Sequence, residues 1–228
     1  MDSAFPVLIF GAFAALVIVL AIFGAIAAKK RREAFAALAA RLGLTFSPDR
    51  DHGIAGRFHF LDRLAHGSNR YAYNILSGSY QGRGVLVFDY HYQTESRGSK
   101  GHRQTHHYHF SCFVLQLERS FFSELTIAPE GVLSKVAQTF GYDDIDFESH
   151  EFSRKFCVRS KDKKFAYDVC HARMIEYLLA NDDLNIEIEN NVLAIAYSGV
   201  LKPEEIEPNL QRLAQVRALM PNYLFAST

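Results

Sequence analysis

Histidine is the residue type most concentrated in one region, because eight of the ten histidines lie in the first half of the chain. Neutral imidazoles that converge with a carboxylate are typical ligands of zinc and similar divalent metals. If two strands join in a hairpin centred near Gly98–Ser99, Asp89 lies opposite His109 and His91 opposite His107. All four side chains then share one face of the sheet, which indicates a candidate metal site.

The alternative interpretation of this region needs no metal. A slip of one residue in strand pairing would move the histidines to the opposite face. His107 and His109 would then simply be exposed to solvent. Aromatic residues of the same strands would form the core side: Tyr90, Tyr92, Tyr108 and Phe110.

An acidic run in the second half is another candidate cation site. Its members are Asp143, Asp144, Asp146, Glu148 and Glu151. Oxygen-rich clusters suit Mg²⁺ or Ca²⁺, but the glycine and the ligand spacing of an EF-hand loop are missing here. We favour a solvated loop in which Asp146 and Glu148 cap a helix or pair with Arg154 and Lys155.

Nucleophilic catalysis has little support. Cys170 and His171 are neighbours on a predicted helix, where adjacent side chains point about 100° apart and do not form a dyad. The sequence contains no G-x-S-x-G, H-E-x-x-H, phosphate-binding-loop or dinucleotide-binding motif. Cys170 is predicted to pack in the core, and enzymatic activity is unsupported.

The elements that must position these residues alternate between strand and helix patterns. About seven strands, mostly joined by hairpins, and three or four helices predict an α+β domain with an antiparallel sheet. The expected strands include 70–80, 84–93, 105–118, 124–128 and 152–160, with a later hairpin around Asn190 and Asn191. Helices are expected over 132–140, 162–179 and from Pro203 onward.

The N-terminal segment has a different character. From Ala4 to Ala28 the chain has no charged residue, and Lys29, Lys30, Arg31 and Arg32 follow. A helix of 25 residues covers roughly 37 Å, enough to cross a hydrocarbon core of roughly 30 Å. A cleaved signal peptide is the alternative, but it would carry a basic start and a shorter apolar stretch.

The basic cluster predicts orientation and lipid contact. Lys29, Lys30, Arg31 and Arg32 follow the span and no basic residue precedes it, so the positive-inside rule places the N-terminus outside and the rest in the cytoplasm. These four side chains are expected at the lipid headgroups of the inner membrane. Small residues four apart would let a partner helix approach: Gly11 and Ala15, Ala21 and Ala25, Gly24 and Ala28.

Charge and cysteine content are consistent with a cytoplasmic domain that binds no nucleic acid. Residues 1–32 hold four of the 25 basic side chains and one of the 25 acidic ones, so 21 basic and 24 acidic residues remain. That balance lacks the cationic surplus of nucleic-acid binding. The three cysteines, Cys112, Cys157 and Cys170, have no paired or metal-like spacing and are expected to be reduced.

Residues 33–44 are predicted to continue the membrane helix on the cytoplasmic side. Phe35, Leu38 and Leu42 have the spacing of one helix face. We favour docking of this face on the chain's own domain; the alternative is a contact with another subunit. The predicted organisation is thus an anchor over 1–32, a juxtamembrane helix over 33–44 and one α+β domain over 45–228.

Four sequence blocks stand out: VFDYHY at 87–92, HRQT at 102–105, DFESHEFSRKFCVRSKD at 146–162 and the following FAYDVCHARMIEYLL. Together they resemble a family of bacterial, single-pass membrane-anchored proteins of unknown function. The resemblance covers roughly residues 70–220. It implies an anchored cytosolic α+β domain, and it brings no activity or catalytic residue with it.

Two functions from different classes follow. The favoured one is a membrane-tethered, non-catalytic module, an accessory subunit or scaffold with a membrane protein partner or a second copy of itself. It needs no cofactor. The alternative is a domain that binds zinc or another divalent metal, or uses it for hydrolysis, through Asp89, His91, His107 and His109.

Overall fold

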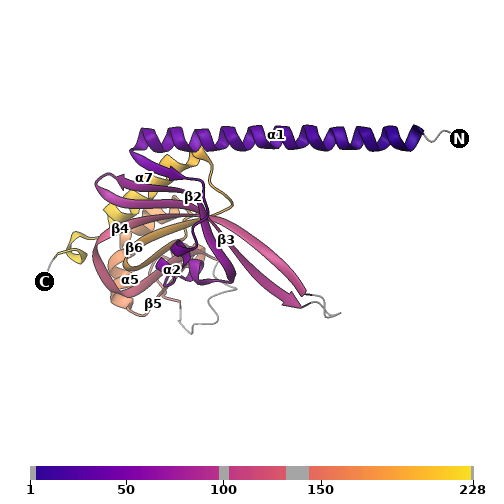
Figure 1. Cartoon of the computed structure of the whole chain (residues 1–228). Coiled ribbons are helices and arrows are strands. Elements are labelled where there is room, and N and C mark those ends of the chain that lie inside the picture. The colour runs from indigo at the N-terminus through magenta and orange to yellow at the C-terminus, as the bar shows by residue number, and fades with distance from the viewer. Residues whose placement is uncertain (1–3, 98–102, 132–143, 227–228) are drawn as a thin grey trace.

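The computed structural model describes residues 4–97, 103–131 and 144–226, and in the first helix it describes side chains from Ala15 onward. That helix, α1 (Ala4–Leu42), is 39 residues long. It runs along one side of a folded domain and extends well beyond it (Figure 1). The predicted juxtamembrane helix and the predicted span therefore belong to one continuous helix, with no break at residue 32.

One antiparallel sheet of six strands forms the centre of the described domain, in the order β1-β2-β3-β4-β5 with β6 also pairing with β4. Its strands are β1 (Leu44–Ser47), β2 (Ser68–Tyr80), β3 (Arg83–Arg97), β4 (Arg103–Pro129), β5 (Phe156–Ser160) and β6 (Ile186–Ser198). The described residues also form seven α-helices, including α1. After α1 they are α2 (Gly53–Arg57), α3 (Asp62–Ala65), α4 (His150–Lys155), α5 (Lys163–Val169), α6 (Ala172–Leu179) and α7 (Pro203–Leu219), and a 3-10 turn, Asn222–Leu224, follows. The predicted α+β class is confirmed.

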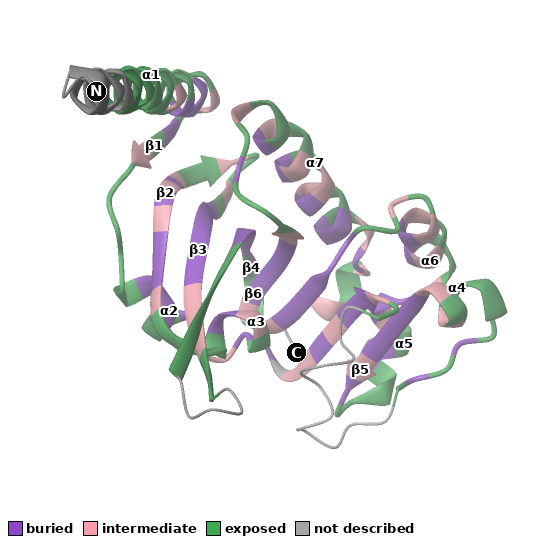
Figure 2. Cartoon of the chain, turned by 90° about the vertical axis from the view of Figure 1, so that its right-hand side faces the viewer, coloured by how far each residue is buried: buried purple, intermediate pink, exposed green. Residues whose placement is uncertain are grey.

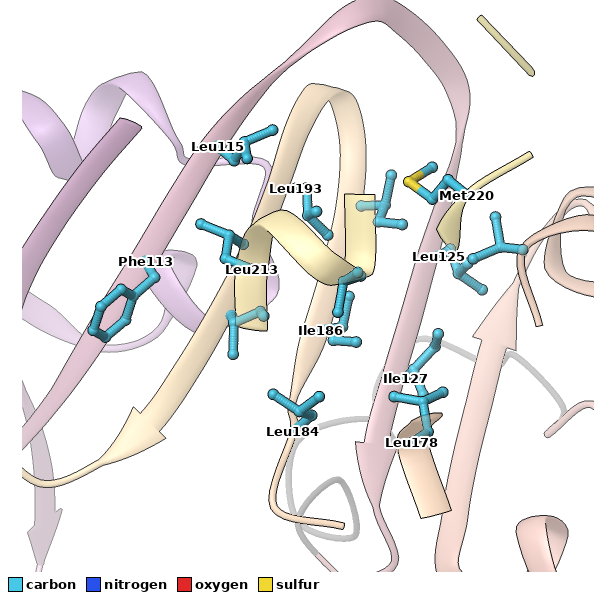
Figure 3. Close-up of a cluster of buried hydrophobic side chains, with 14 of the residues drawn as sticks. Phe113, Leu115, Leu125, Ile127, Leu178, Leu184, Ile186, Leu193, Leu213 and Met220 are labelled. Carbon is cyan, nitrogen blue, oxygen red and sulfur yellow. The ribbon is translucent and has the colours of Figure 1, made fainter. Parts of the chain in front are cut away.

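Strands β4 and β6 both bend, and they pair with each other along two separate stretches. One arm of β4 pairs with β6 from Phe110↔Ser198 to Gln116↔Val192, and the other arm does so from Leu125↔Ile188 to Ile127↔Ile186. Figure 3 shows β4 bending over at its middle. The arms of β6 also lie side by side, since the Ala196 N–H donates to the Asn185 carbonyl at 3.0 Å. The hairpin predicted around Asn190 is confirmed, and its left-handed backbone (φ 52°) marks the bend.

Two apolar clusters cover the two faces of the sheet. The larger one joins the sheet to α1, α5, α6 and α7, and Figure 3 shows side chains of β4, β6 and α7 meeting there. The smaller cluster lies on the other face, where α2 and α3 bring Ile54, Phe58, Leu61 and Leu64 onto β3 and β4. Strands buried on both faces explain why β3 is apolar or aromatic at nearly every position from Val85 to Tyr90.

The C-terminal end of α1 docks on the chain's own domain. Phe35 and Leu38 are buried in the larger cluster, Phe35 stacks on Phe46 of β1 at 5.4 Å, and Leu42 packs at the margin. Arg41 also pairs with Glu207 of α7 at 2.7 Å. The favoured prediction for this face is confirmed. Figure 2 shows α1 becoming exposed beyond this docked end.

Several local predictions were wrong for physical reasons. The turn residues of the segment 45–69 predict a loop with one short strand. The segment contains α2 and α3 as well as β1, because turn residues are also good at starting short helices. The helix expected over 162–179 divides into α5 and α6 at Cys170 and His171. The strand expected over 152–160 begins only at Phe156, after α4. The helix expected over 132–140 lies outside the described residues.

Within the described residues, no helix is long and apolar enough to cross a membrane. The span predicted within residues 1–32 stays a prediction.

We predict that Phe35→Ala lowers the free energy of unfolding of the full chain by about 3–5 kcal/mol, because a fully buried ring is lost from the core. Phe23→Ala on the same helix is the matched control, since Phe23 is 67% exposed. Denaturant unfolding in mild detergent measures both. Equal effects of the two substitutions would contradict the docking of α1.

Candidate functional site

The β3–β4 pairing differs from the predicted register by two residues. Asp89 lies opposite Ser111, His91 opposite His109 and Gln93 opposite His107. The predicted cross-strand pairs were wrong because the hairpin is centred one residue further along the chain. Side chains alternate with a period of two, so a shift of two residues keeps them on the predicted face.

A histidine–tyrosine face results, which we define as Tyr71, Tyr73, His91, His107 and His109. The ring of His91 lies at its centre, 4.5 Å from Tyr71, 5.3 Å from His107 and 4.8 Å from His109. His91 Nε2 lies 3.1 Å from His107 Nδ1, and the Tyr73 hydroxyl lies 3.0 Å from His109 Nδ1. His107 and His109 are exposed, while Tyr71 and His91 are buried.

Two side chains from the segment before α2 complete this face. The guanidinium of Arg50 lies over the Tyr71 ring at 4.5 Å, a cation–π arrangement. His52 lies on the same ring at 5.5 Å and its Nδ1 is 3.0 Å from the Arg70 carbonyl. Tyr71 thus has the Arg50 guanidinium over its ring, stacks on His91 and is buried.

Asp89 is buried completely and is held by backbone and amide donors rather than by histidines. Its Oδ1 accepts a hydrogen bond from the Leu201 N–H at 2.6 Å, and its Oδ2 accepts one from Asn74 Nδ2 at 2.7 Å. Burial raises the pKa of this carboxyl above its usual range, while Asn74, Leu201 and Arg31 oppose that rise. Asp89 therefore fastens the loop before α7 to the middle of the sheet.

Arg31 joins α1 to the same point. Its Nη2 donates to the Leu201 carbonyl at 2.6 Å and lies 3.7 Å from Asp89 Oδ2. The guanidinium also lies 5.0 Å from the Phe35 ring. We call Arg31, Asn74, Asp89 and Leu201 the helix anchor point. Of the four basic residues predicted at the headgroups, Arg31 thus contacts the domain, while Lys29, Lys30 and Arg32 are exposed.

Metal binding has no support among these contacts. No group of three or more histidine, cysteine, aspartate and glutamate side chains in the described part of the chain is placed to hold a metal ion. Burial lowers the pKa of His91, so its neutral form is favoured. The zinc site on Asp89, His91, His107 and His109 stays a prediction.

The acidic run makes different contacts from those predicted. Asp144 accepts hydrogen bonds from Arg159 Nε at 2.6 Å and from the Cys157 thiol at 2.9 Å. Glu151 pairs with Lys155 at 3.1 Å. Asp143 lies outside the described residues. The expected roles of Asp146 and Glu148 were wrong, because Ser149 caps α4 by accepting from the Phe152 N–H and Lys155 pairs with Glu151 instead.

Cys170 is a core residue, as predicted. It is 2% exposed, and burial raises the pKa of its thiol to about 12. His171 Nε2 lies 2.9 Å from the Leu219 carbonyl, so this imidazole contacts the end of α7.

Glu187 is a buried carboxyl that the sequence analysis missed. It lies on β6 beneath the start of α3, where Asp62 and Arg63 present their backbone N–H groups to it. Burial, followed by the charge of Asp62, raises the pKa of Glu187 to about 7. The sequence gives no signal for this burial. Glu187 lies in the alternating segment IEIEN, and that pattern predicts that its side chain is exposed.

The small residues predicted for helix packing are exposed where they are described. Ala15, Ala21, Gly24, Ala25 and Ala28 lie on the part of α1 that extends past the domain. The exposure of Gly11 lies outside what the structure describes. Nothing in the described chain covers this surface.

The crystal structure of the mycobacterial trehalose monomycolate transport factor A, TtfA, is similar to this chain. The TM-score is 0.56 at 13% identity, and the match covers 84% of this chain and 95% of that one. No protein-family model and no curated protein matches the sequence. At this low identity the likeness shows a shared fold only.

We predict that Asp89→Ala lowers the free energy of unfolding by about 2–4 kcal/mol, because the Leu201 N–H and the Asn74 amide lose a buried acceptor. Glu95→Ala is the control, since the Glu95–Arg103 pair is exposed and worth less than about 1 kcal/mol. Denaturant unfolding compares them. An Asp89→Ala effect as small as that of the control would refute the anchor point.

We predict that Glu187 makes the chain less stable as pH rises from about 4.5 through about 7, because its folded pKa is raised above the unfolded value of 4.5. The loss amounts to about 3 kcal/mol. Glu187→Gln mimics the protonated acid, so it should match the parent at pH 4 and exceed its stability at pH 8. Glu204→Gln, on the exposed start of α7, is the control. Parallel stability profiles for the parent and Glu187→Gln would contradict this assignment.

Proposed function

We propose that this protein is a membrane-tethered, non-catalytic cytoplasmic module that serves as an accessory subunit or scaffold of a membrane protein complex. One observation carries the proposal. The helix α1 is fixed to the domain at its C-terminal end, while the rest of its described length carries large apolar side chains that nothing in the described chain covers.

The exposed apolar surface calls for an apolar environment. Side chains between 46% and 67% exposed follow one another along α1: Leu16, Val17, Ile18, Val19, Leu20, Ile22, Phe23 and Ile26. Exposure of apolar surface to water costs roughly 25 cal/mol of free energy per Å². They surround the helix rather than form one stripe, which favours lipid over the flat side of a protein. Together with the uncharged residues before them they form the proposed anchor.

The basic residues give the proposed orientation. Lys29, Lys30 and Arg32 are exposed directly after the apolar stretch, where lipid headgroups would lie. By the positive-inside rule, the domain lies in the cytoplasm and the N-terminus on the other side.

The similar structure and the resemblance support the accessory role. TtfA is named a trehalose monomycolate transport factor. The sequence resembles bacterial single-pass anchored proteins, and it contains no G-x-S-x-G, H-E-x-x-H, phosphate-binding-loop or dinucleotide-binding motif. An accessory subunit would use the exposed small residues Ala21, Gly24, Ala25 and Ala28 to contact a membrane helix of its partner or of a second copy.

Membrane extraction tests the anchor. The double variant Val19→Arg, Phe23→Arg should release the chain from membranes, because each central arginine costs about 2.5–3.5 kcal/mol in a membrane helix. The matched control is Ala36→Arg, Ala40→Arg, at exposed positions on the docked end of the same helix. Alkaline extraction followed by immunoblotting should find the parent and the control in the membrane. A parent chain released by this treatment would refute the tether.

Gentle extraction tests the accessory role. A C-terminally tagged chain should co-purify with a membrane protein, or with itself, in fixed stoichiometry. Gly24→Leu with Ala28→Leu should reduce that yield about tenfold or more, because bulk prevents close helix approach. Ile22→Leu with Ile26→Leu, which keeps size, should leave it unchanged. A parent chain that runs only as a monomer with nothing attached would contradict the proposal.

A further inference from the structure

We propose that the histidine–tyrosine face, together with Arg50, binds the phosphate groups of anionic lipids at the bilayer surface. The inference deepens the proposed function and rests on it, because the tether determines which way this face is turned.

The position of the face is the first argument. The free part of α1 and the far end of the β3–β4 hairpin extend from the domain to the same side and diverge from each other (Figure 1). Asp89 contacts Arg31 on α1, and His91 follows two residues further along β3, on the same face and in the direction of the hairpin end. Each two residues advance about 6.6 Å along a strand. A bilayer that begins at Lys29 would therefore meet this face.

The donors on the face are the second argument. Phosphate oxygens accept hydrogen bonds and prefer cationic or polarised donors. The exposed imidazoles of His107 and His109, the Tyr73 hydroxyl and the Arg50 guanidinium offer such donors from three different segments. Stacking of Tyr71 between Arg50 and His91 holds this array in place.

The balance of charge is the third argument. The two acidic residues on this face of β3 are already engaged, Asp89 at the helix anchor point and Glu95 with Arg103. Beside Arg50, Asp51 accepts hydrogen bonds from the N–H groups of Gly53 and Ile54. Lys30 and Arg32 add positive charge from α1, where Lys29 already pairs with Glu33 at 3.9 Å. The surface therefore suits an anionic layer better than a cationic or an apolar partner.

Hydrogen exchange of the full chain in lipid vesicles tests the inference. The chain is reconstituted in phosphatidylcholine alone and in phosphatidylcholine with phosphatidylglycerol. Backbone amides of residues 94–97 and 103–107 should exchange about tenfold more slowly in the anionic vesicles. The triple variant Arg50→Gln, His107→Gln, His109→Gln should lose this protection. The control triple variant Arg57→Gln, His59→Gln, His66→Gln changes exposed residues around α2 and α3 and should retain it.

The outcomes separate the inference from the tether. A chain that fails to float with phosphatidylcholine vesicles refutes the tether and this inference with it. A chain that floats but shows equal exchange in both vesicles refutes the inference alone. Protection that appears only when a co-purified protein is present also refutes it, because that protein would then occupy the face.

Discussion

The attachment of α1 to the sheet is the contact on which the rest of the arrangement depends. Burial of Phe35 and Leu38 supplies the apolar part of this contact. Arg31 and Asp89 supply the polar part. Arg31 donates a hydrogen bond to the Leu201 carbonyl, and Asp89 accepts one from the Leu201 N–H. Because the carboxylate of Asp89 is buried completely, loss of a donor would leave an unpaired charge or polar group in the core. The direction of the helix is thus set by the domain itself.

A fixed helix gives the domain a fixed orientation. The exposed apolar part of α1 needs lipid or protein around it, and the histidine–tyrosine face lies beside the path of that helix (Figure 1). A flexible linker would let the domain turn freely, whereas a docked helix presents the same surface to the membrane or to a partner at all times. The accessory role that we propose depends on this fixed arrangement.

The general architecture could be predicted from the sequence, but its register and its polar contacts could not. Alternation and aromatic content were enough for β2, β3 and the bend at Asn190, because these patterns follow from burial on a pleated sheet. The centre of the β3–β4 hairpin was misplaced by one residue, because the loop between the strands is polar and fixes no turn. The sequence predicts Asp89 as a metal ligand beside His91. Its contacts with Asn74, Leu201 and Arg31 could not be predicted, because these residues are 15, 112 and 58 positions away along the chain and a single sequence gives no signal for such contacts.

Spin labels on α1 test the central claim most directly. Single cysteines replace Phe23 on the exposed part and Ala36 on the docked end, and the native cysteines are buried. The full chain is studied in lipid bilayers by electron paramagnetic resonance with oxygen and a water-soluble nickel chelate as relaxation agents. The account predicts that a label at position 23 is relaxed by oxygen and protected from nickel, and that a label at position 36 shows the reverse. Equal access of nickel to both labels would contradict it.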